Sequence, residues 1–336
     1  MRAWCVVVPR EKGEEVRRLL RDRGLLAKGL RITEEGGRLY VPTAGRVDLG
    51  IPVEEREFPE GFVPVRSYKD LVRVPDPLRP LLPTAFDVIG DIAVLKIPEG
   101  LSAHREEIGR AVLAWNPKVR VVAQDHGVLG ELRVRQVEVI AGEARTTTVH
   151  LEHGLRYRVD VARAYFSPRL GTERLRIASQ VQPGEAVADP FAGVGPYAIL
   201  IAKRRKPSRV EASDANPAAV ELLRRNVAAN RAGRVEVREG DARQVMRAIG
   251  SVDRVILDIP HTAMDFLVGA LRPLGARGTV HLYGILAAAE REERTSAIRE
   301  IATRSGYTVE GLEVHEVRAY SPARHHVAFD LTVSRT

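Results

Sequence analysis

The sequence predicts an α/β protein in which a doubly wound, mostly parallel sheet follows two smaller α+β domains. The chain has 336 residues, which is long for one ordinary domain and suits two or three. From Ser167 onward, apolar runs of strand length alternate with helical segments, the pattern of a parallel sheet with crossover helices. Before that point, short strands and amphipathic helices are mixed. We therefore expect domains at residues 1–58, 66–162 and 163–336.

The composition is that of a folded, basic protein. Hydrophobic residues make up 44% and charged residues 29%, a globular balance. The net charge of +8 and the pI near 9.8 favour a polyanionic partner. The single cysteine, Cys5, excludes an intrachain disulfide and a thiol zinc cluster. No run of ~18 uncharged apolar residues occurs, so we expect no membrane-spanning helix and a soluble, intracellular protein.

The first block is expected to form a strand, a helix and a strand. Ala3–Val8 is apolar and β-branched, Glu11–Asp22 has apolar residues at helical spacing, and Arg38–Pro42 has the pattern of a short strand. The following stretch, Ile51–Pro64, is rich in proline and charge. We expect it to be a linker that holds the domain boundary.

The second block has the pattern of an α+β domain rich in arginine. Phe86–Ile97 consists of two short β runs separated by Gly90-Asp91, which is typical of a tight turn. A helix is expected at His104–Ala114. Further strands are expected at Val119–Val122, Leu132–Ile140, Thr146–His150 and Arg156–Val161.

The third block supplies the parallel sheet. Expected strands at Ala186–Asp189 and Val210–Asp214 are each followed by a helix, Tyr197–Lys203 and Pro217–Arg231. The remaining expected strands are Val235–Glu239, Asp253–Asp258 and Gly278–Tyr283.

A glycine loop, Asp189-Pro-Phe191-Ala192-Gly193-Val194-Gly195, joins the first of these strands to its helix. The two glycines allow a tight turn and close approach to a ligand. The dinucleotide fingerprint is incomplete, because Ala198 stands where its third glycine would be. The acid that precedes the loop suits a cationic ligand better than a pyrophosphate. The sulfonium and amino groups of S-adenosylmethionine meet that requirement, whereas an NAD-dependent enzyme fits less well.

Three consecutive strands end in an acid: Asp189, Asp214 and Asp241, the last followed by Ala242. Open α/β sheets bind ligands at this edge, where Asp214 could accept both ribose hydroxyls and Asp241 the adenine amino group. Asn216 could cap the next helix or contact the ligand. One such acid alone is usually a turn former or a helix cap. Three in order, with the glycine loop, favour a binding site for S-adenosylmethionine.

Several motifs of this chain resemble one family, the archaeal and eukaryotic type of tRNA (guanine-N1)-methyltransferase, which modifies guanosine 37, the nucleotide 3′ of the anticodon. The resemblance covers most of the chain. The motifs are Phe86–Lys96, Arg133 with Ile140–Glu143, Tyr165–Arg174, Asp189–Gly195, and Tyr320-Ser-Pro with His326 and Asp330. It implies a class I, Rossmann-like methyltransferase domain, S-adenosylmethionine as cofactor, and tRNA as partner. The N-terminal block resembles the family's accessory domain, which helps grip the outer corner of the tRNA.

The resemblance also implies roles for individual residues. Glu173 matches the general base on guanine N1, Arg133 an arginine that stabilises O6, and Tyr165 an aromatic that orders the target nucleotide. A base and a nearby cation suit this chemistry, because guanine N1 is a poor nucleophile until it is deprotonated. The family usually has Asn-Leu-Pro at the fourth strand end, where this chain has Asp258-Ile-Pro260. The acid could accept a hydrogen bond from the guanine amino group but could not donate one.

Structural interpretations stand beside these roles. Glu173 begins an expected helix, where it could pair with Arg176 at i,i+3. Arg133 could be one of several solvated arginines. Asp258 and Pro260 could form only a turn at the strand end. No histidine or acid spacing suggests a metal site, so none is expected.

Two other functions remain open at this point. A wyosine-pathway enzyme could act on a tricyclic guanosine derivative by methyl or aminocarboxypropyl transfer, on a similar scaffold. A non-catalytic RNA-binding protein could retain the fold, although the intact glycine loop and three acids disfavour it. For the methyltransferase hypothesis we expect a cytoplasmic monomer with no membrane association.

Overall fold

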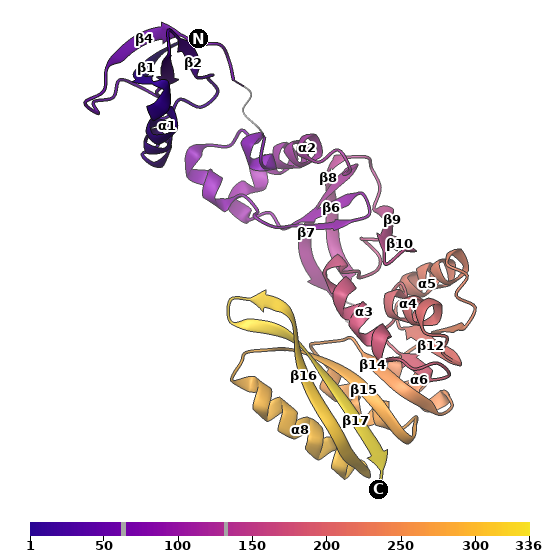
Figure 1. Ribbon diagram of the computed structural model, residues 1–336. Helices are drawn as coiled ribbons and strands as arrows, with labels where there is room; N and C mark the ends of the chain where they lie inside the picture. The colour runs from indigo at the N-terminus through magenta and orange to yellow at the C-terminus, as the bar shows by residue number, and fades with distance from the viewer. Residues whose placement is uncertain (62–64, 131–133) are drawn as a thin grey trace. The chain divides into compact units, whose positions relative to one another are not determined.

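The computed structural model describes residues 1–61, 65–130 and 134–336 of the chain (Figure 1). It folds as two compact units, Met1–Asp70 and Leu71–Thr336. None of the helices that these residues form combines the length and the apolarity needed to cross a membrane.

The first unit is a four-stranded antiparallel sheet with one helix against it. The strand order is β2 (Thr33–Glu35), β3 (Arg38–Pro42), β1 (Arg2–Pro9) and β4 (Val53–Glu57). Helix α1 (Gly13–Asp22) turns its apolar side, including the fully buried Leu20, toward this sheet. The strand, helix and strand expected from the sequence are confirmed.

The expectation of a linker at Ile51–Pro64 was wrong over its first part. Strand β4 pairs with β1 from Val6↔Val53 to Arg2↔Glu57, and Phe58 is only 2% exposed. The Val-Glu-Glu-Arg-Glu sequence of β4 is highly charged, and this charge obscured the strand. Charged side chains are typical of an edge strand, whose outer face is in water.

The second unit begins with the sheet β5 (Asp87–Ile89), β6 (Ile92–Leu95), β7 (Val121–Leu129) and β8 (Val134–Gly142). Helix α2 (Arg105–Trp115) packs on it, and β9 (Thr147–Glu152) pairs with β10 (Leu155–Asp160) as a hairpin. These elements confirm the expected ones, except that β7 runs on to Leu129, well past the end of the strand expected at Val119–Val122. The predicted tight turn is present, and Gly90 has φ 58°.

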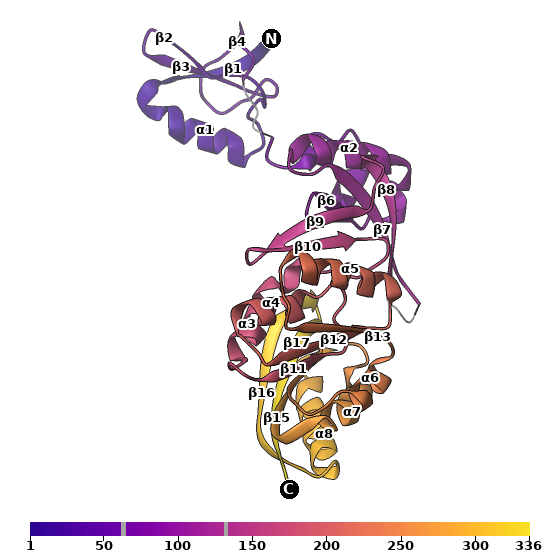
Figure 2. The same cartoon turned by 90° about the vertical axis from the view of Figure 1, so that its right-hand side faces the viewer.

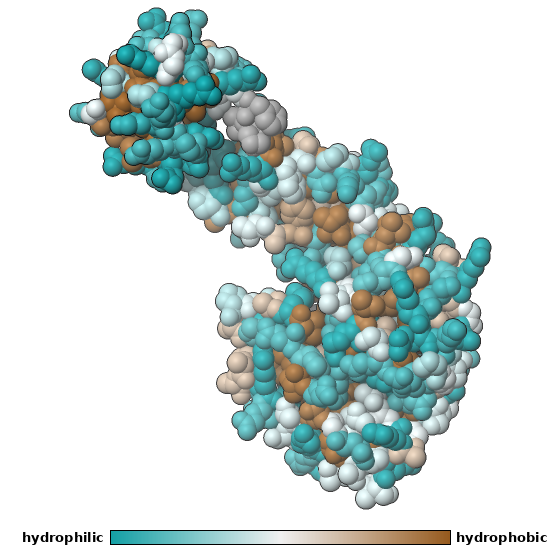
Figure 3. Space-filling view, viewed as in Figure 1, coloured by the Kyte–Doolittle hydropathy of each residue, from teal (hydrophilic) through white to brown (hydrophobic). Residues whose placement is uncertain are grey.

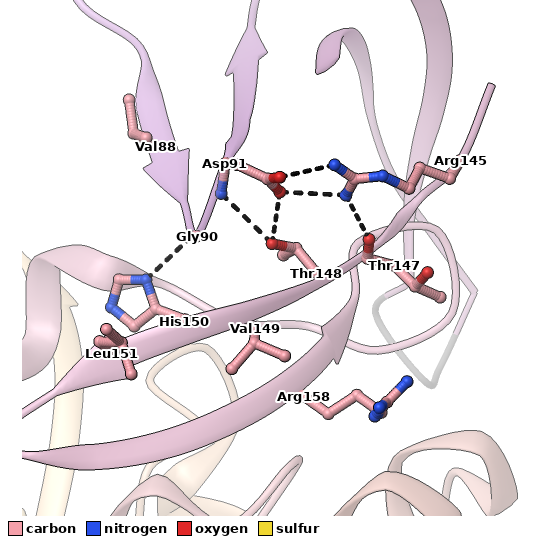
Figure 4. A pocket seen from close by; sticks show the side chains of 10 residues that line it. All are labelled: Val88, Gly90, Asp91, Arg145, Thr147, Thr148, Val149, His150, Leu151 and Arg158. Atoms are coloured by element: carbon pink, nitrogen blue, oxygen red, sulfur yellow. Dashed lines mark hydrogen bonds and ion pairs between the residues drawn. The ribbon is translucent and has the colours of Figure 1, made fainter. Parts of the chain in front are cut away.

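A surface pocket of about 620 Å³ lies where the β5–β6 turn meets the β9–β10 hairpin (Figure 4). Asp91 accepts hydrogen bonds from the Arg145 guanidinium at 2.6 and 3.0 Å and from the Thr148 hydroxyl at 2.7 Å. The backbone N–H of Gly90 donates to Nδ1 of His150 at 3.1 Å. Because these polar groups form hydrogen bonds with one another, we interpret them as a structural contact between the β5–β6 turn and the β9–β10 hairpin.

The rest of the second unit is built on a seven-stranded sheet (Figure 2). Its first five strands are parallel, and the last two run antiparallel to their neighbours. The order is β13 (Val235–Glu239), β12 (Arg209–Asp214), β11 (Ala186–Asp189), β14 (Val252–Leu257), β15 (Leu274–Leu286), β17 (Arg324–Arg335) and β16 (Tyr307–Ser321).

Helices cover both faces of this sheet, which confirms the doubly wound class. One apolar core contains Ile177, Ile199 and Leu223 of three helices. These are α3 (Gly171–Gln180), α4 (Pro196–Arg204) and α5 (Pro217–Ala229). The other core contains residues of α6 (Ala242–Ala248), α7 (Leu267–Leu271) and α8 (Glu290–Arg304).

The fold depends on glycine at position 195, where the loop passes close to α5. Gly195 has φ 92°, and a Cβ there would lie 2.3 Å from Cδ1 of Leu223. Gly184 has a similar φ of 88°, but a Cβ there would meet nothing within 4 Å. Comparing substitutions at the two glycines therefore separates the cost of backbone strain from the cost of crowding by an added side chain.

We expect Gly195→Ala to lower the free energy of unfolding by about 1–3 kcal/mol more than Gly184→Ala, because only the first overpacks the core. Urea denaturation of both variants measures the difference. Equal losses of stability in the two variants would show that the Leu223 side chain can move aside at no cost in free energy.

Candidate active site

A cavity of about 500 Å³ lies at the carboxyl ends of the parallel strands. It contains most of the side chains that the sequence assigned to a site. Those that line it are Tyr165, Phe191, Ala192, Gly193, Val194, Asp214, Asn216, Asp241, Ala242, Asp258 and Pro260. The strand-end pattern therefore brings these residues together as expected.

Three assigned residues are not among those that line it. Asp189 and Gly195 are in the glycine loop, and Glu173 is buried in α3. Arg133 lies outside the described residues.

Asp189 is a fully buried acid at the end of β11, with 0% exposure. By hydrogen-bond geometry, neither of its carboxylate oxygens has a partner within the described part of the chain. Burial and, to a lesser extent, the charges of Asp258 and Asp214 raise its pKa to about 8, although the nearby backbone N–H groups of Phe191 and Ala198 oppose the shift. This carboxyl group holds a proton near neutral pH until a positive charge comes close.

Asp214 orders the glycine loop and the start of α5. Its Oδ2 accepts from the backbone N–H of Gly193 at 2.8 Å, and its Oδ1 accepts from that of Asn216 at 2.8 Å. Gly193 has φ 54°, so a residue with a side chain would be strained there. Burial raises the pKa of Asp214, although these backbone donors oppose the shift. Each oxygen keeps a lone pair that a ligand hydroxyl could use.

Asn216 and Asp241 are both helix caps. Oδ1 of Asn216 accepts from the N–H of Ala218 at 3.0 Å at the start of α5. Oδ1 of Asp241 accepts from the N–H of Arg243 at 2.8 Å at the start of α6. The structural interpretation of these two residues is therefore confirmed, and both still face the cavity.

One wall of the cavity is aromatic. The rings of Phe191 and Phe266 meet edge to face, with centroids 4.9 Å apart and an interplanar angle of 82°. The guanidinium of Arg243 lies 4.1 Å from the centroid of Phe266. An apolar surface with polar groups on its rim suits a flat heteroaromatic ligand.

Asp258 and Pro260 lie at another part of the cavity, after β14. Burial raises the pKa of Asp258 to about 6; the charge of Arg174 opposes the shift, as does that of Arg318, and the charge of Glu173 contributes to it. Tyr165 also lines the cavity and is 42% exposed, with the Arg135 guanidinium 5.3 Å from its ring centroid.

Glu173 is 5% exposed and tightly held. Its two oxygens accept from Nε and Nη2 of Arg176 at 2.8 and 2.7 Å, which confirms the i,i+3 pair. The hydroxyl of Tyr283 donates to Oε1 at 2.7 Å. Tyr197, which lines the cavity, has its hydroxyl 3.1 Å from that of Tyr283. Two hydroxyls therefore connect the cavity to Glu173.

Among the cavity residues that the sequence did not single out as site candidates are Arg174, Arg318, Tyr320 and His326. Arg174 is 2% exposed and bonds Glu152 and the carbonyl of Ser167. Arg174, Tyr320 and His326 lie within motifs of the family resemblance, which could have singled them out. For Arg318 we see no comparable signal.

Glu313, His315 and Asp330 bring possible metal-binding atoms within 4.8 Å of one another. Sequence spacing did not suggest this group. Asp330 already accepts hydrogen bonds from Arg176, Gln180 and His281. Since a metal ion would have to displace these donors, we assign the group no metal.

Models of known families match three consecutive parts of the chain. Residues 148–310 match the TRM5/TYW2 methyltransferase domain. Residues 69–146 match the TYW2 N-terminal domain, and residues 5–47 match the tRNA methyltransferase 5 N-terminal domain.

Similar proteins extend this match to almost the whole chain. The tRNA (guanine(37)-N(1))-methyltransferase Trm5b of Pyrococcus abyssi is 40% identical over 98% of this chain and 99% of its own. Its crystal structure has a TM-score of 0.76, with 99% of each chain covered. The structure of aTrm5 with tRNALeu has a TM-score of 0.70 at 31% identity, covering 98% and 99%. The structure of Methanocaldococcus jannaschii TYW2 with AdoMet has a TM-score of 0.60 at 26% identity, covering 75% and 100%.

The raised pKa of Asp189 predicts how stability depends on pH. The folded protein keeps the proton up to pH about 8, whereas the unfolded chain loses it near the ordinary aspartate pKa of 3.8. This group's contribution is therefore complete below the unfolded pKa and is lost as the pH rises through the folded pKa.

We expect Asp189→Asn to gain stability relative to the wild type as pH rises from about 4 to 8, by at most about 1.4 kcal/mol per pH unit. Urea denaturation across this range, without ligand, measures the difference. Parallel stability profiles for the two proteins would contradict the assignment.

Proposed function

Since the chain belongs to the TRM5/TYW2 methyltransferase family, we propose that it transfers a methyl group from S-adenosylmethionine to N1 of guanosine 37 in tRNA. The observation that carries the proposal is the cavity at the strand ends, where three acids and the glycine loop converge. The full-length similarity to a Trm5b enzyme supports the same reaction.

The residues of the cavity fit S-adenosylmethionine. The charges of Asp214 and Asp258 raise the cost of ionising Asp189, whose buried oxygens make no hydrogen bond of normal geometry in the described chain. A ligand with net positive charge relieves that cost. We assign Asp214 to the ribose hydroxyls, Asp241 to the adenine amino group, and Phe191 to the wall beside the base. When bound, the cofactor supplies a methyl group on positively charged sulfur, which is already activated for transfer.

The chain's own residues would prepare the nucleophile. We assign Glu173 as the acceptor of the N1 proton, and the hydroxyls of Tyr283 and Tyr197 as its connection to the cavity. Arg176 holds the carboxylate in place from the other side. We assign Arg133 to O6, where negative charge develops as N1 loses its proton.

Other residues would position the tRNA. Tyr165, being exposed at the cavity, offers a surface on which the extruded nucleotide can stack. Asp258 can accept from the guanine amino group beside Pro260. We propose that residues 1–58 and 66–162 hold the RNA, with the chain's +8 charge favouring phosphate contacts.

We further propose that the protein acts as a cytoplasmic monomer. A tRNA substrate supports the assignment to the cytoplasm.

Methyl transfer to unmodified tRNA transcripts tests the proposed reaction. We expect labelled S-adenosylmethionine to give 1-methylguanosine with a transcript carrying G37 and no product with A37. Nuclease digestion and mass spectrometry identify the nucleoside. If the cofactor binds but G37 stays unmodified, the proposal fails, and a tricyclic wyosine intermediate becomes the substrate to try.

The assignment of Glu173 predicts a kinetic effect that an ion pair alone would not give. We expect Glu173→Gln to lower the single-turnover rate by about 10²- to 10⁴-fold, because the amide cannot accept the N1 proton. Cofactor affinity should stay unchanged. The matched control is Glu221→Gln, which breaks the Glu221–Arg225 pair on α5. A normal rate combined with a lower melting temperature would leave Glu173 only its structural role.

A further inference from the structure

Two opposed residues of the C-terminal hairpin line the cavity and carry buried nitrogen atoms without hydrogen-bond partners in the described chain. Arg318 of β16 and His326 of β17 are Cα partners in the antiparallel register, and both line the cavity. Nε of Arg318 and both ring nitrogens of His326 are buried and have no hydrogen-bond partner among the residues described. Two cross-strand neighbours therefore carry three polar atoms to which the described part of the fold gives no hydrogen bond.

Leaving these atoms unpaired is costly unless a ligand satisfies them. His326 is 3% exposed, and its ring lies 5.4 Å from that of Tyr283. Burial, with the nearby charges of Arg318 and His261, lowers the pKa of His326 to about 4. The imidazole is therefore neutral at pH 7, with one N–H to donate and one nitrogen to accept. A buried polar group typically has a partner, and its absence calls for an explanation.

Neighbouring charges on the hairpin and on α8 differ from this pair. Arg324 bonds Glu290 at 3.1 and 3.3 Å, and Glu316 accepts from Arg291 at 2.7 Å and contacts His325 at 2.6 Å. For Arg318 the contact in this part of the chain is with an aromatic ring, that of Tyr320 at 5.9 Å. The charges of Arg324, Glu316 and Arg291 are thus paired, whereas Nε of Arg318 and the ring nitrogens of His326 are not.

The position of the pair indicates what it would contact. The charge of Arg318 lowers the pKa of Asp258, which places the two groups within electrostatic reach. Asp258 and Pro260 follow β14, at the place that the proposed function gives to the methyl acceptor. Guanine presents two adjacent acceptors, O6 and N7, on one edge, whereas adenine presents one acceptor and a donor amino group there.

We propose that Arg318 and His326 recognise the target guanine by donating hydrogen bonds to O6 and N7, and so select guanine over adenine. This inference rests on the proposed function and adds two specificity-determining residues to it. O6 has two lone pairs, so it can accept from the hairpin as well as from Arg133. Donors at O6 also stabilise the charge that forms there when N1 is deprotonated.

The test combines base analogues with variants in single-turnover methyl transfer. Transcripts carry guanosine, 7-deazaguanosine or inosine at position 37. The second lacks the N7 acceptor, and the third lacks the 2-amino group but keeps O6 and N7. For the wild type we expect 7-deazaguanosine to react about 5- to 100-fold more slowly than guanosine, the range of one good base contact.

In the Arg318→Gln/His326→Phe double variant we expect a slower reaction with guanosine and no further loss with 7-deazaguanosine. The inosine penalty should stay as in the wild type, because the hairpin does not contact the amino group. Arg324→Gln on the same hairpin is the matched control and should keep the wild-type 7-deaza penalty. S-adenosylmethionine affinity and melting temperature report whether each variant is folded. If the double variant does not fold, Arg318→Lys with wild-type His326 provides a milder substitution.

A wild type that methylates guanosine and 7-deazaguanosine equally overturns the inference without any variant, and leaves the proposed function standing. A folded double variant that keeps the full 7-deaza penalty overturns it as well. If the wild type fails to methylate G37 at all, the proposed function and this inference both fall.

Discussion

The buried carboxyl group of Asp189 is the constraint on which the site depends. It lies at the end of β11, where its oxygens make no hydrogen bond of normal geometry within the described structure, and Asp214 and Asp258 are close enough to raise its pKa. Three acids held together in this way are unfavourable in the empty protein and favourable around a cation. The glycine loop is bonded to one of them, Asp214, so the shape of the cavity and its electrostatic character have the same origin.

A second polar network ties the sheet to the proposed base. His281 of β15 contacts Asp330 of β17 at 2.7 Å and Arg254 of β14 at 2.7 Å, and all three are buried. Asp330 also binds Arg176, which holds Glu173 on α3. Glu173 therefore has a fixed position because residues of three strands of the sheet fix its partner Arg176. Hydropathy colouring shows a mostly polar surface on the visible face of the catalytic part, with brown apolar patches between the polar groups (Figure 3).

Much of this architecture could be predicted from the sequence, because strand-end acids and the glycine loop are local patterns. Asp214 and Asp241 lie where alternating strands and helices placed them. The C-terminal hairpin could not be predicted in this way. Its strand β16 has a highly charged sequence, and its pairing with β17 is irregular, with a register shift between Glu316 and Arg318. Only that pairing brings Arg318 opposite His326. Likewise, local spacing predicted the ion pair of Glu173 with Arg176. It could not predict the hydrogen bond with Tyr283, which is 110 residues away in the sequence.

Proton release on ligand binding tests most directly whether buried acids make this cavity a cation site. Titration calorimetry at pH 7, in buffers of different ionisation enthalpy, measures it. S-adenosylmethionine carries one more positive charge than S-adenosylhomocysteine, on sulfur. Because that charge favours ionisation of the Asp189 group, we expect S-adenosylmethionine to release more protons than S-adenosylhomocysteine, and Asp189→Asn to reduce the difference. Equal proton release by the two ligands would contradict the assignment of a cation site to these acids.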